Sequence, residues 1–315
     1  MIVVLGSLNL DLVAEVPAFP QPGETIPGTR FRRLPGGKGA NQALAIARMG
    51  SRVAMFGAVG DDPSGHEMIA ALEAAGVDVS GIRRRGDVAS GTALILVDAS
   101  GQNQIVVVAG ANGTLTADDT TASALALDQA RALVVQLEIP LPAVTGAIHA
   151  AASAGVPVFL NAAPAGEVPD ETLAATDWIL VNETEAVVLA GIGNDASATP
   201  AALAQCLRQR SDGACVAVTL GALGAWIACD EFTGHIPGFE VPVVDTVGAG
   251  DAFVGAFVDR IILGDPAYDA AVFATAAGAV AVTRPGAQSG IPTAVEVVEF
   301  LRSRPATGSR PNSSW

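Results

Sequence analysis

One aspartate follows three small residues at a predicted helix start that could bind an anion. The run Asp245–Phe257 reads D-T-V-G-A-G-D-A-F-V-G-A-F, and Asp251 stands directly after Gly248, Ala249 and Gly250. Small residues at a helix start let backbone N–H groups approach an anion, and the helix N-terminus adds positive partial charge. A carboxylate there could take a proton from a hydroxyl that attacks the anion. It could also simply cap the helix, because Asp is a preferred N-cap residue.

A second set of polar residues suits a hydroxyl-rich ligand. Asn9 and Asp11 alternate with leucines, which predicts that they share one face of a strand. The Gly-rich run that follows contains Gly36, Gly37 and Asn41, whose small residues would let a ligand touch the backbone. Carboxylate and carboxamide groups can each bind two hydroxyls. Asn9 and Asp11 could equally form a solvated strand face.

Two further clusters stand near predicted strand ends, where open α/β sheets bind ligands. In N-E-T-E, Asn182 and Glu185 are three apart and would share a helix face. They could hold water ligands of Mg²⁺, or only cap a helix with acids in its first turn. In T-L-G-A-L-G, from Thr219 to Gly224, the glycines could wrap phosphates or form an ordinary hairpin turn. The sequence contains neither the P-loop pattern nor G-x-G-x-x-G.

Composition limits the class of protein. The formal net charge of −15 argues against a nucleic-acid partner, because phosphate backbones require clustered Lys and Arg. No apolar run reaches the length of a membrane span, and the Met1–Gly6 segment predicts a strand rather than a signal peptide. The three cysteines have no C-x-x-C spacing and are expected to be core thiols in a reducing, cytoplasmic compartment: Cys206, Cys215 and Cys229.

Alternating strand and helix patterns predict the fold that must position these residues. Strands separated by helices of about a dozen residues indicate an α/β domain with a central, mostly parallel sheet between two helical layers. Helices are expected at Lys38–Met49, Ala117–Leu127 and Ala252–Leu263, and a strand at Phe239–Val244. The basic run Arg83–Arg85 is interpreted as a solvated strand end.

A small β-sheet is predicted to stand outside the main domain, as a lid formed by about residues 9–35 and 90–110. We expect one domain over residues 1–304 and a loose tail over residues 305–315. Exposed edge strands of the lid would invite pairing with a second copy of the chain, so we expect a homodimer.

Two motifs together carry a resemblance to a known family. G-G-K-G-A-N-Q-A near the N-terminus and D-T-V-G-A-G-D-A-F near the C-terminus resemble the two signatures of the ribokinase-type sugar and nucleoside kinases. The resemblance extends from about Ile2 to Arg302 and includes G-S-L-N-L-D, A-G-A-N, Q-L-E, N-E-T-E, T-L-G and A-V-T-R-P-G-A-Q. It implies the α/β/α fold with a β lid and ATP-dependent phosphorylation of D-ribose at O5. The alternatives are a kinase for 2-deoxyribose, fructose or adenosine, and a non-catalytic sugar-binding protein on the same fold.

The resemblance also implies a role for each matching position. Asp251 would be the general base, and the backbone of Val247–Gly250, with Gly248, Ala249 and Gly250, would form an anion hole. Sugar contacts are implied for Asn9, Asp11, Gly36, Gly37, Lys38, Asn41, Glu138 and Asp251. Contacts to ATP are implied for Asn182, Glu185, Thr219, Gly221, Gly224, Gly250 and Thr275, with Glu185 holding Mg²⁺ through water. An activating K⁺ would be held at Asp245, Val247, Ala281, Arg284, Gly286 and Gly290.

Two positions depart from the family pattern. Thr275 stands where relatives often carry Asn or His near the adenine, which puts that contact in doubt. Gly290 stands where a Ser is frequent in the K⁺ loop. A backbone ligand would survive this change, whereas a hydroxyl ligand would not.

Overall fold

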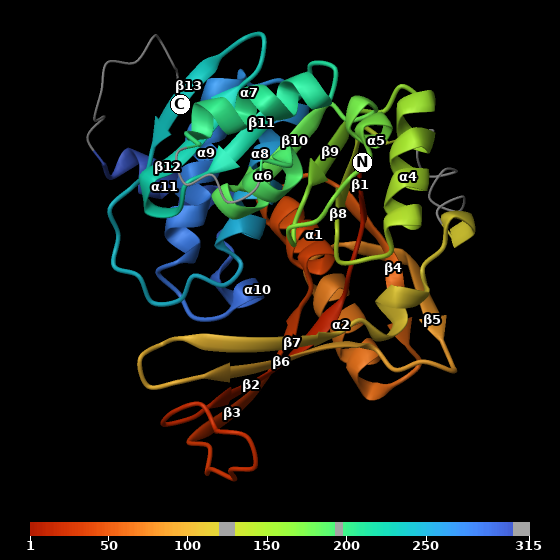
Figure 1. Ribbon diagram of the computed structural model, residues 1–315, viewed down its shortest axis with the longest axis vertical. Helices are drawn as coiled ribbons and strands as arrows, with labels where there is room; N and C mark the ends of the chain where they lie inside the picture. Colours follow the sequence, from red (N-terminus) through yellow and green to blue (C-terminus); the bar gives the residue numbers. More distant parts are fainter. Residues whose placement is uncertain (120–129, 193–197, 305–315) are drawn as a thin grey trace.

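The computed structural model describes residues 1–119, 130–192 and 198–304. A large sheet lies between two groups of helices, and a smaller sheet stands apart from it, at the lower end of the view in Figure 1. The predicted fold class is therefore confirmed. Residues 120–127 of the expected helix and the tail 305–315 lie outside the described residues.

The large sheet in the described part of the chain has nine strands in the order β13-β12-β11-β10-β9-β8-β1-β4-β5. The strands from β11 to β5 in this order are parallel, and β12 and β13 add an antiparallel edge. Their carboxyl ends therefore meet at one edge of the sheet, where ligands bind in such folds. The strands are β1 (Ile2–Leu5), β4 (Val53–Gly60), β5 (Asp78–Arg85), β8 (Ala132–Gln136), β9 (Val158–Asn161), β10 (Trp178–Asn182), β11 (Cys215–Thr219), β12 (Gly224–Ala228) and β13 (Thr233–Pro237).

Strand β1 shows why the sheet needs helices on both faces. All four of its residues are buried; Ile2 and Val4 join one apolar core, whereas Val3 and Leu5 join the other. The first core is covered by α1 (Lys38–Met49), α2 (Pro63–Ala74), α8 (Ala249–Leu263), α9 (Ala267–Ala281) and α11 (Ala294–Arg302). The second is covered by α4 (Leu141–Ser153), α5 (Asp170–Ala174), α6 (Glu183–Ala190) and α7 (Pro200–Arg210). Short helical turns are η1 (Gly110–Thr114), η2 (Gly221–Leu223) and α10 (Ala287–Gly290).

The smaller sheet, called the lid below, has the strand order β3-β2-β6-β7. Its strands are β2 (Asn9–Glu15), β3 (Arg30–Gly36), β6 (Gly91–Val97) and β7 (Asn103–Val108). The register pairs Asn9 with Gly36 on one side and with Gly91 on the other. Because side chains alternate between the faces of a strand, Asn9 and Asp11 lie on the same face of the lid.

Two predicted elements differ from the structure. The strand expected at Phe239–Val244 is wrong, because this run forms no strand and crosses instead to the end of α9, where the Val244 N–H donates to the Val282 carbonyl. The basic run Arg83–Arg85 ends the edge strand β5, with Arg83 and Arg84 exposed, which confirms its interpretation as a solvated strand end. Helix α8 begins three residues before the expected Ala252. No described helix is long and apolar enough to cross a membrane.

Candidate active site

The start of α8 places Asp251 inside the first helical turn. The N-cap residue is Gly248, whose φ of 80° is left-handed and whose Cβ, if it had one, would lie 2.8 Å from the Ala287 Cα. The Asp251 carboxylate accepts hydrogen bonds from Asn41 Nδ2 and Gln42 Nε2, each at 2.9 Å. Asp251 is therefore not the N-cap, and its carboxylate is held by side chains of α1.

The backbone N–H groups beside Asp251 divide into two kinds. The Val247 N–H donates to Asp245 Oδ1 at 3.0 Å, and the Ala249 N–H donates to the Thr246 carbonyl at 3.3 Å. The N–H groups of Gly248 and Gly250 have no such acceptor among the described residues. An anion at this helix start would therefore meet mainly the latter two.

The Lys38 ammonium offsets part of the negative charge around Asp251. Asp251 is buried, and this burial raises the pKa of its carboxyl, while the Lys38 charge and the hydrogen bonds from α1 act in the opposite direction. Burial lowers the pKa of the Lys38 ammonium, but the carboxylates of Asp251, Glu138 and Glu185 outweigh burial and raise it. Lys38 therefore stays charged at neutral pH.

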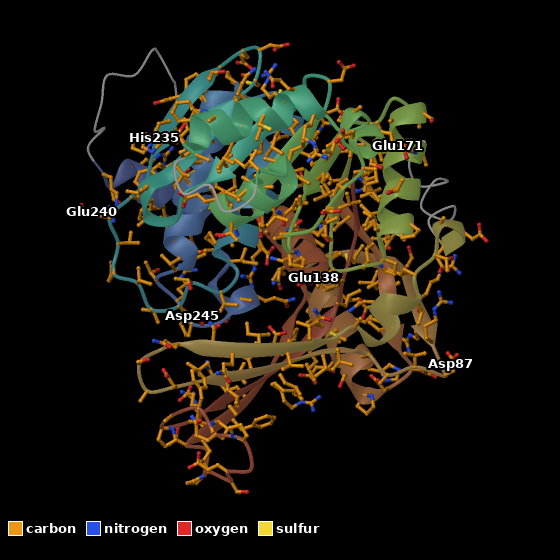
Figure 2. All side chains as sticks on the ribbon, viewed as in Figure 1. Asp87, Glu138, Glu171, His235, Glu240 and Asp245 are labelled. Carbon is orange, nitrogen blue, oxygen red and sulfur yellow. The ribbon has the colours of Figure 1, made fainter. Side chains whose placement is uncertain are left out.

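Glu138, in the loop after β8, joins the lid to the Gly-rich helix start. Its Oε2 accepts the Lys38 backbone N–H at 3.0 Å, the Ser7 hydroxyl at 2.5 Å and, more weakly, Asn9 Nδ2 at 3.5 Å. Asn112 in turn donates to Asn9 Oδ1 at 2.8 Å. Figure 2 shows Glu138 on the side of the large domain that faces the lid. Asn9 is 3% exposed, so the solvated-face interpretation is wrong for this residue.

Close backbone packing fixes the rest of this cluster. Gly37 has a φ of 89°, and a Cβ there would lie 2.7 Å from the Asn9 nitrogen. A Cβ on Gly36 would lie 2.5 Å from Asp11 Oδ2, so the Asp11 carboxylate lies against the Gly36 backbone. Burial, then the nearby Glu138 and Asp251 charges, raise the pKa of Asp11 to about 7. The Oδ1 atom of Asn41 is buried and has no hydrogen-bond partner among the described residues.

The N-E-T-E cluster caps α6 and also faces the site. Asn182 and Glu185 form a capping box, in which each side chain accepts the other residue's backbone N–H at 2.8 Å. The cap interpretation is thus confirmed. Burial raises the pKa of Glu185, against the hydrogen bond from Asn182 and the charge of Lys38, so the carboxyl also belongs to the charged cluster.

A cavity of about 230 Å³ joins the start of α8, the N-E-T-E cluster, Thr219 and Lys38, and of the expected sugar residues only Lys38 and Asp251 line it. Its lining includes Lys38, Asn182, Glu185, Thr219, Thr246, Gly248, Gly250 and Asp251. Three expected nucleotide residues do not line it. Gly221 and Gly224 form the turn after Thr219, and Thr275 is buried in α9 with an Oγ1 that has no partner among the described residues.

The expected K⁺ residues surround the loop between α9 and α10. Asp245 Oδ2 accepts the Gly286 N–H at 2.8 Å, which ties this loop to the segment before α8, and Figure 2 shows Asp245 on the side facing the lid. A Cβ on Gly290 would lie 3.1 Å from the Ala281 carbonyl oxygen and 3.6 Å from that of Arg284. Two carbonyl oxygens therefore converge beside Gly290.

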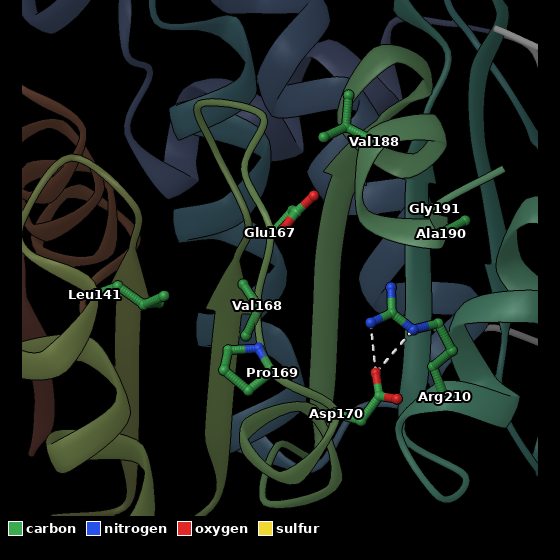
Figure 3. A pocket seen from close by; sticks show the side chains of 9 residues that line it. All are labelled: Leu141, Glu167, Val168, Pro169, Asp170, Val188, Ala190, Gly191 and Arg210. Atoms are coloured by element: carbon green, nitrogen blue, oxygen red, sulfur yellow. Dashed lines mark hydrogen bonds and ion pairs between the residues drawn. The ribbon is translucent and has the colours of Figure 1, made fainter. Parts of the chain in front are cut away.

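A larger hollow of about 500 Å³ lies elsewhere, near α5, α6 and α7 (Figure 3). Two of its charged residues, Asp170 and Arg210, bind each other, with Arg210 Nε 2.9 Å from Asp170 Oδ1. Its lining includes none of the expected site residues. Chemistry rather than volume therefore identifies the smaller cavity as the site.

Sequence reasoning missed a group of buried polar residues behind the site. Gln42 contacts Asp251 directly, and Gln136 and Asn161 contact Gln42. Ser7 donates a hydrogen bond to Glu138, and Asn112 donates one to Asn9. Gln42 lies inside G-G-K-G-A-N-Q-A and Asn112 inside A-G-A-N. Polar residues at those positions of otherwise apolar elements were the signal that could have revealed them.

A parallel α/β sheet, a lid near its carboxyl edge, and a buried carboxylate at a Gly-rich helix start together define a small-molecule phosphotransferase. A family model described as pfkB family carbohydrate kinase matches residues 1–294. The chain belongs to this family of carbohydrate kinases.

Comparison with individual proteins agrees with the family. The chain is 41% identical over 301 residues to the ribokinase of Haemophilus influenzae, covering 95% of this chain and 97% of that one. It is 36% identical over 302 residues to the deoxyribokinase of Salmonella typhi, covering 95% and 98%. Among solved structures, ribokinase from Thermotoga maritima has a TM-score of 0.88 at 33% identity, covering 96% and 99%. Arabidopsis thaliana ribokinase, complexed with ribose and ATP, has a TM-score of 0.86 at 31% identity, covering 96% and 98%.

Proposed function

We propose that the protein transfers the γ-phosphoryl group of ATP to the O5 hydroxyl of D-ribose. The observation that carries this proposal is the buried Asp251 carboxylate in the first turn of α8, which accepts hydrogen bonds from Asn41 and Gln42 and lies near the charge of Lys38. The similarity to ribokinases over nearly the whole chain supports ribose as the sugar.

The sugar would lie between the lid and the Gly-rich helix start. Asn9, Asp11 and Glu138 offer oxygens and N–H groups to its hydroxyls, and Gly36 and Gly37 let it approach the backbone. The unpartnered Asn41 Oδ1 would accept a sugar hydroxyl.

Transfer makes one bond and breaks one. Asp251 accepts the O5 proton while the O5–P bond forms and the bond from the γ-phosphorus to the leaving ADP oxygen breaks. The N–H groups of Gly248 and Gly250, with the Lys38 charge, would stabilise negative charge on the transferred group.

The residues present fit Mg²⁺ bound together with the nucleotide. Glu185 lines the cavity, so its carboxylate would hold a water ligand of Mg²⁺, and phosphate and further water oxygens would supply the other ligands. When bound, Mg²⁺ supplies charge neutralisation at the phosphates. Asn182 and Thr219 line the same cavity and would contact the nucleotide.

Two further expectations belong to this proposal. A K⁺ ion would be held by Asp245 and by carbonyl oxygens beside Gly290, without touching either substrate. A second copy of the chain would pair through the lid. The cytoplasmic location stays a prediction.

Replacing the proposed base tests the mechanism. Asp251→Asn should lower kcat by roughly 10²- to 10⁴-fold, because a general base is lost, while ribose binding by calorimetry changes little. A matched control is Asp259→Asn, another buried aspartate of α8, which should leave kcat nearly unchanged. Turnover of Asp251→Asn close to that of the parent would refute the catalytic assignment.

A panel of acceptors tests the substrate. ATP consumption should be fast with ribose, slower with 2-deoxyribose and slow with fructose or adenosine, because a site built to bind a hydroxyl leaves its own groups unpaired when that hydroxyl is missing. The four lid strands contain one aromatic residue, Phe31, which disfavours a nucleoside pocket. If ATP is consumed faster with adenosine or a phosphorylated sugar than with ribose, the ribose proposal fails, while the family assignment is unaffected.

A further inference from the structure

Three buried carboxamides form a connected group behind Asp251. Gln136 is the last residue of β8 and Asn161 the last of β9, and the register pairs them across the sheet. Gln42 extends from α1 and contacts both of them. Gln42 and Gln136 are fully buried, and Asn161 is 7% exposed.

A backbone carbonyl fixes the orientation of Asn161. The Leu180 carbonyl can only accept, and Asn161 Nδ2 donates to it at 2.9 Å. Asn161 Oδ1 must then face Gln42, and it accepts from Gln42 Nε2 at 2.9 Å. The same Nε2 donates its second hydrogen to Asp251 Oδ1.

The Gln42 oxygen is held from the other side. Gln136 Nε2 donates to Gln42 Oε1 at 2.6 Å. If the Gln42 amide turned over, its oxygen would face both Asp251 Oδ1 and Asn161 Oδ1, and its NH₂ group would face the Gln136 NH₂ group. Every contact in the group would then become repulsive, so Gln42 has one stable orientation.

The group also carries a cost that packing alone does not explain. Gln136 Oε1 is buried with no partner among the described residues, and such an unpaired atom lowers the stability of the fold. A Cβ on Gly6 would lie 2.0 Å from this oxygen, so β1 is followed by a glycine where Gln136 needs the space. An apolar residue at position 136 would avoid the unpaired oxygen but could not orient Gln42.

We propose that Gln42, oriented by Asn161 and Gln136, is a positioning residue that holds the Asp251 carboxylate ready to accept the substrate proton. This rests on the proposed function, because it assigns a partner to the base of that reaction. The Gln42 N–H donates to the ionised Asp251 carboxylate. This hydrogen bond lowers the pKa of Asp251, whereas burial raises it. The other charged groups that face Asp251 are Lys38, Glu138, Glu185 and Asp11.

The test is Gln42→Met, which keeps the volume and removes the amide. A hydrogen bond to a charged group is lost, so kcat should fall about 10- to 100-fold, and the acidic limb of the kcat/KM profile should move to higher pH. The KM for the best sugar of the acceptor panel should change little. Gln136→Met should shift the limb in the same direction by a smaller amount, and it provides the test if Gln42→Met does not fold.

The controls separate this inference from the proposed function. Asp251→Asn in the same assay tests the base itself: if it remains active, the proposed function fails. If Asp251→Asn is inactive but Gln42→Met and Gln136→Met keep the parent kcat and pH profile, only the positioning role is overturned. A lowered kcat with an unmoved acidic limb and a lowered melting temperature would assign Gln42 to packing instead.

Discussion

The carboxyl groups of the site repel one another in the absence of substrate. Asp11, Glu138, Glu185 and Asp251 come from four separate segments, and Lys38 is the cation that faces the last three. Ordinary packing would not retain so many acids at one place, since each buried charge costs stability. Raised carboxyl pKa values such as those of Asp11, Glu185 and Asp251 are typical of functional sites. The cluster is therefore best understood as prepared for a ligand that supplies hydroxyl donors and a metal-bound phosphate.

The raised pKa of Asp11 predicts a pH-dependent affinity for the sugar. The carboxylate form accepts two hydroxyls, and it forms as the pH rises through about 7. Ribose binding measured by calorimetry should therefore weaken below pH 7, level off above pH 8, and release protons near pH 7. Asp11→Asn should bind ribose more weakly with little pH dependence. An equal affinity of the parent protein at pH 6 and pH 8 would contradict the assignment.

The same pKa also determines how Asp11 affects stability. Its folded-state pKa of about 7 lies above the ordinary value of 3.8, so folding favours the protonated form. The stability that Asp11 contributes is fully present below pH 3.8 and is lost as the pH rises through 7. Asp11→Asn should accordingly raise the melting temperature of the sugar-free protein at pH 8.

Sequence reasoning found the residues proposed to contact the ligands better than the residues that orient them. Asp251, Asn41 and Glu185 stand in motifs whose chemistry is visible from their types and spacing. Gln136 and Asn161 are polar ends of apolar strands, and only the register of β8 and β9 brings them together. Neutral amides gain their role from orientation, which spacing along the chain does not encode.

At the scale of elements, two helix starts meet at the site because α1 and α8 pack closely. Gly255 of α8 has its Cα against Ala45 of α1, and a Cβ there would lie 2.3 Å from the Ala45 Cβ. This contact sets the distance from Asn41 to Asp251. The small residues were visible in the sequence, but the pairing of these two helices across about 210 residues was not.

The loop between α9 and α10 should make the enzyme sensitive to the monovalent cation. Asp245 ties this loop to the segment that precedes Gly248, so a K⁺ ion there would order the proposed anion hole. Activity should rise when Na⁺ is replaced by K⁺ at constant ionic strength, and Asp245→Asn should reduce that rise. The exposed Asp230 provides a control, as Asp230→Asn. Equal rates in K⁺, Na⁺ and a bulky organic cation would show that the Gly290 loop holds no activating ion.

At the scale of the whole molecule, the lid exposes an apolar edge strand. Four consecutive residues of β7 are more than half exposed, from Ile105 (51%) to Val108 (53%), and Leu94 on β6 is 47% exposed. The register pairs Leu94 with Val106 and Ala93 with Val107. Because Asp11 pairs with Ala93, Leu94 and Val106 lie on the lid face opposite to Asp11.

Such a strand is a liability unless another chain covers it, because its edge and its apolar side chains both invite pairing. A second copy of the chain has the same apolar strand, and the two strands can cover each other across a two-fold axis. We therefore expect the protein to sediment as a dimer. Val106→Glu should place a charge in the contact and shift the dimer toward monomer at micromolar concentration. Val295→Glu is the matched control, since Val295 on α11 is 66% exposed and lies outside the lid. If the parent protein sediments as a monomer, or if Val106→Glu and Val295→Glu behave alike, the lid is not the dimer contact.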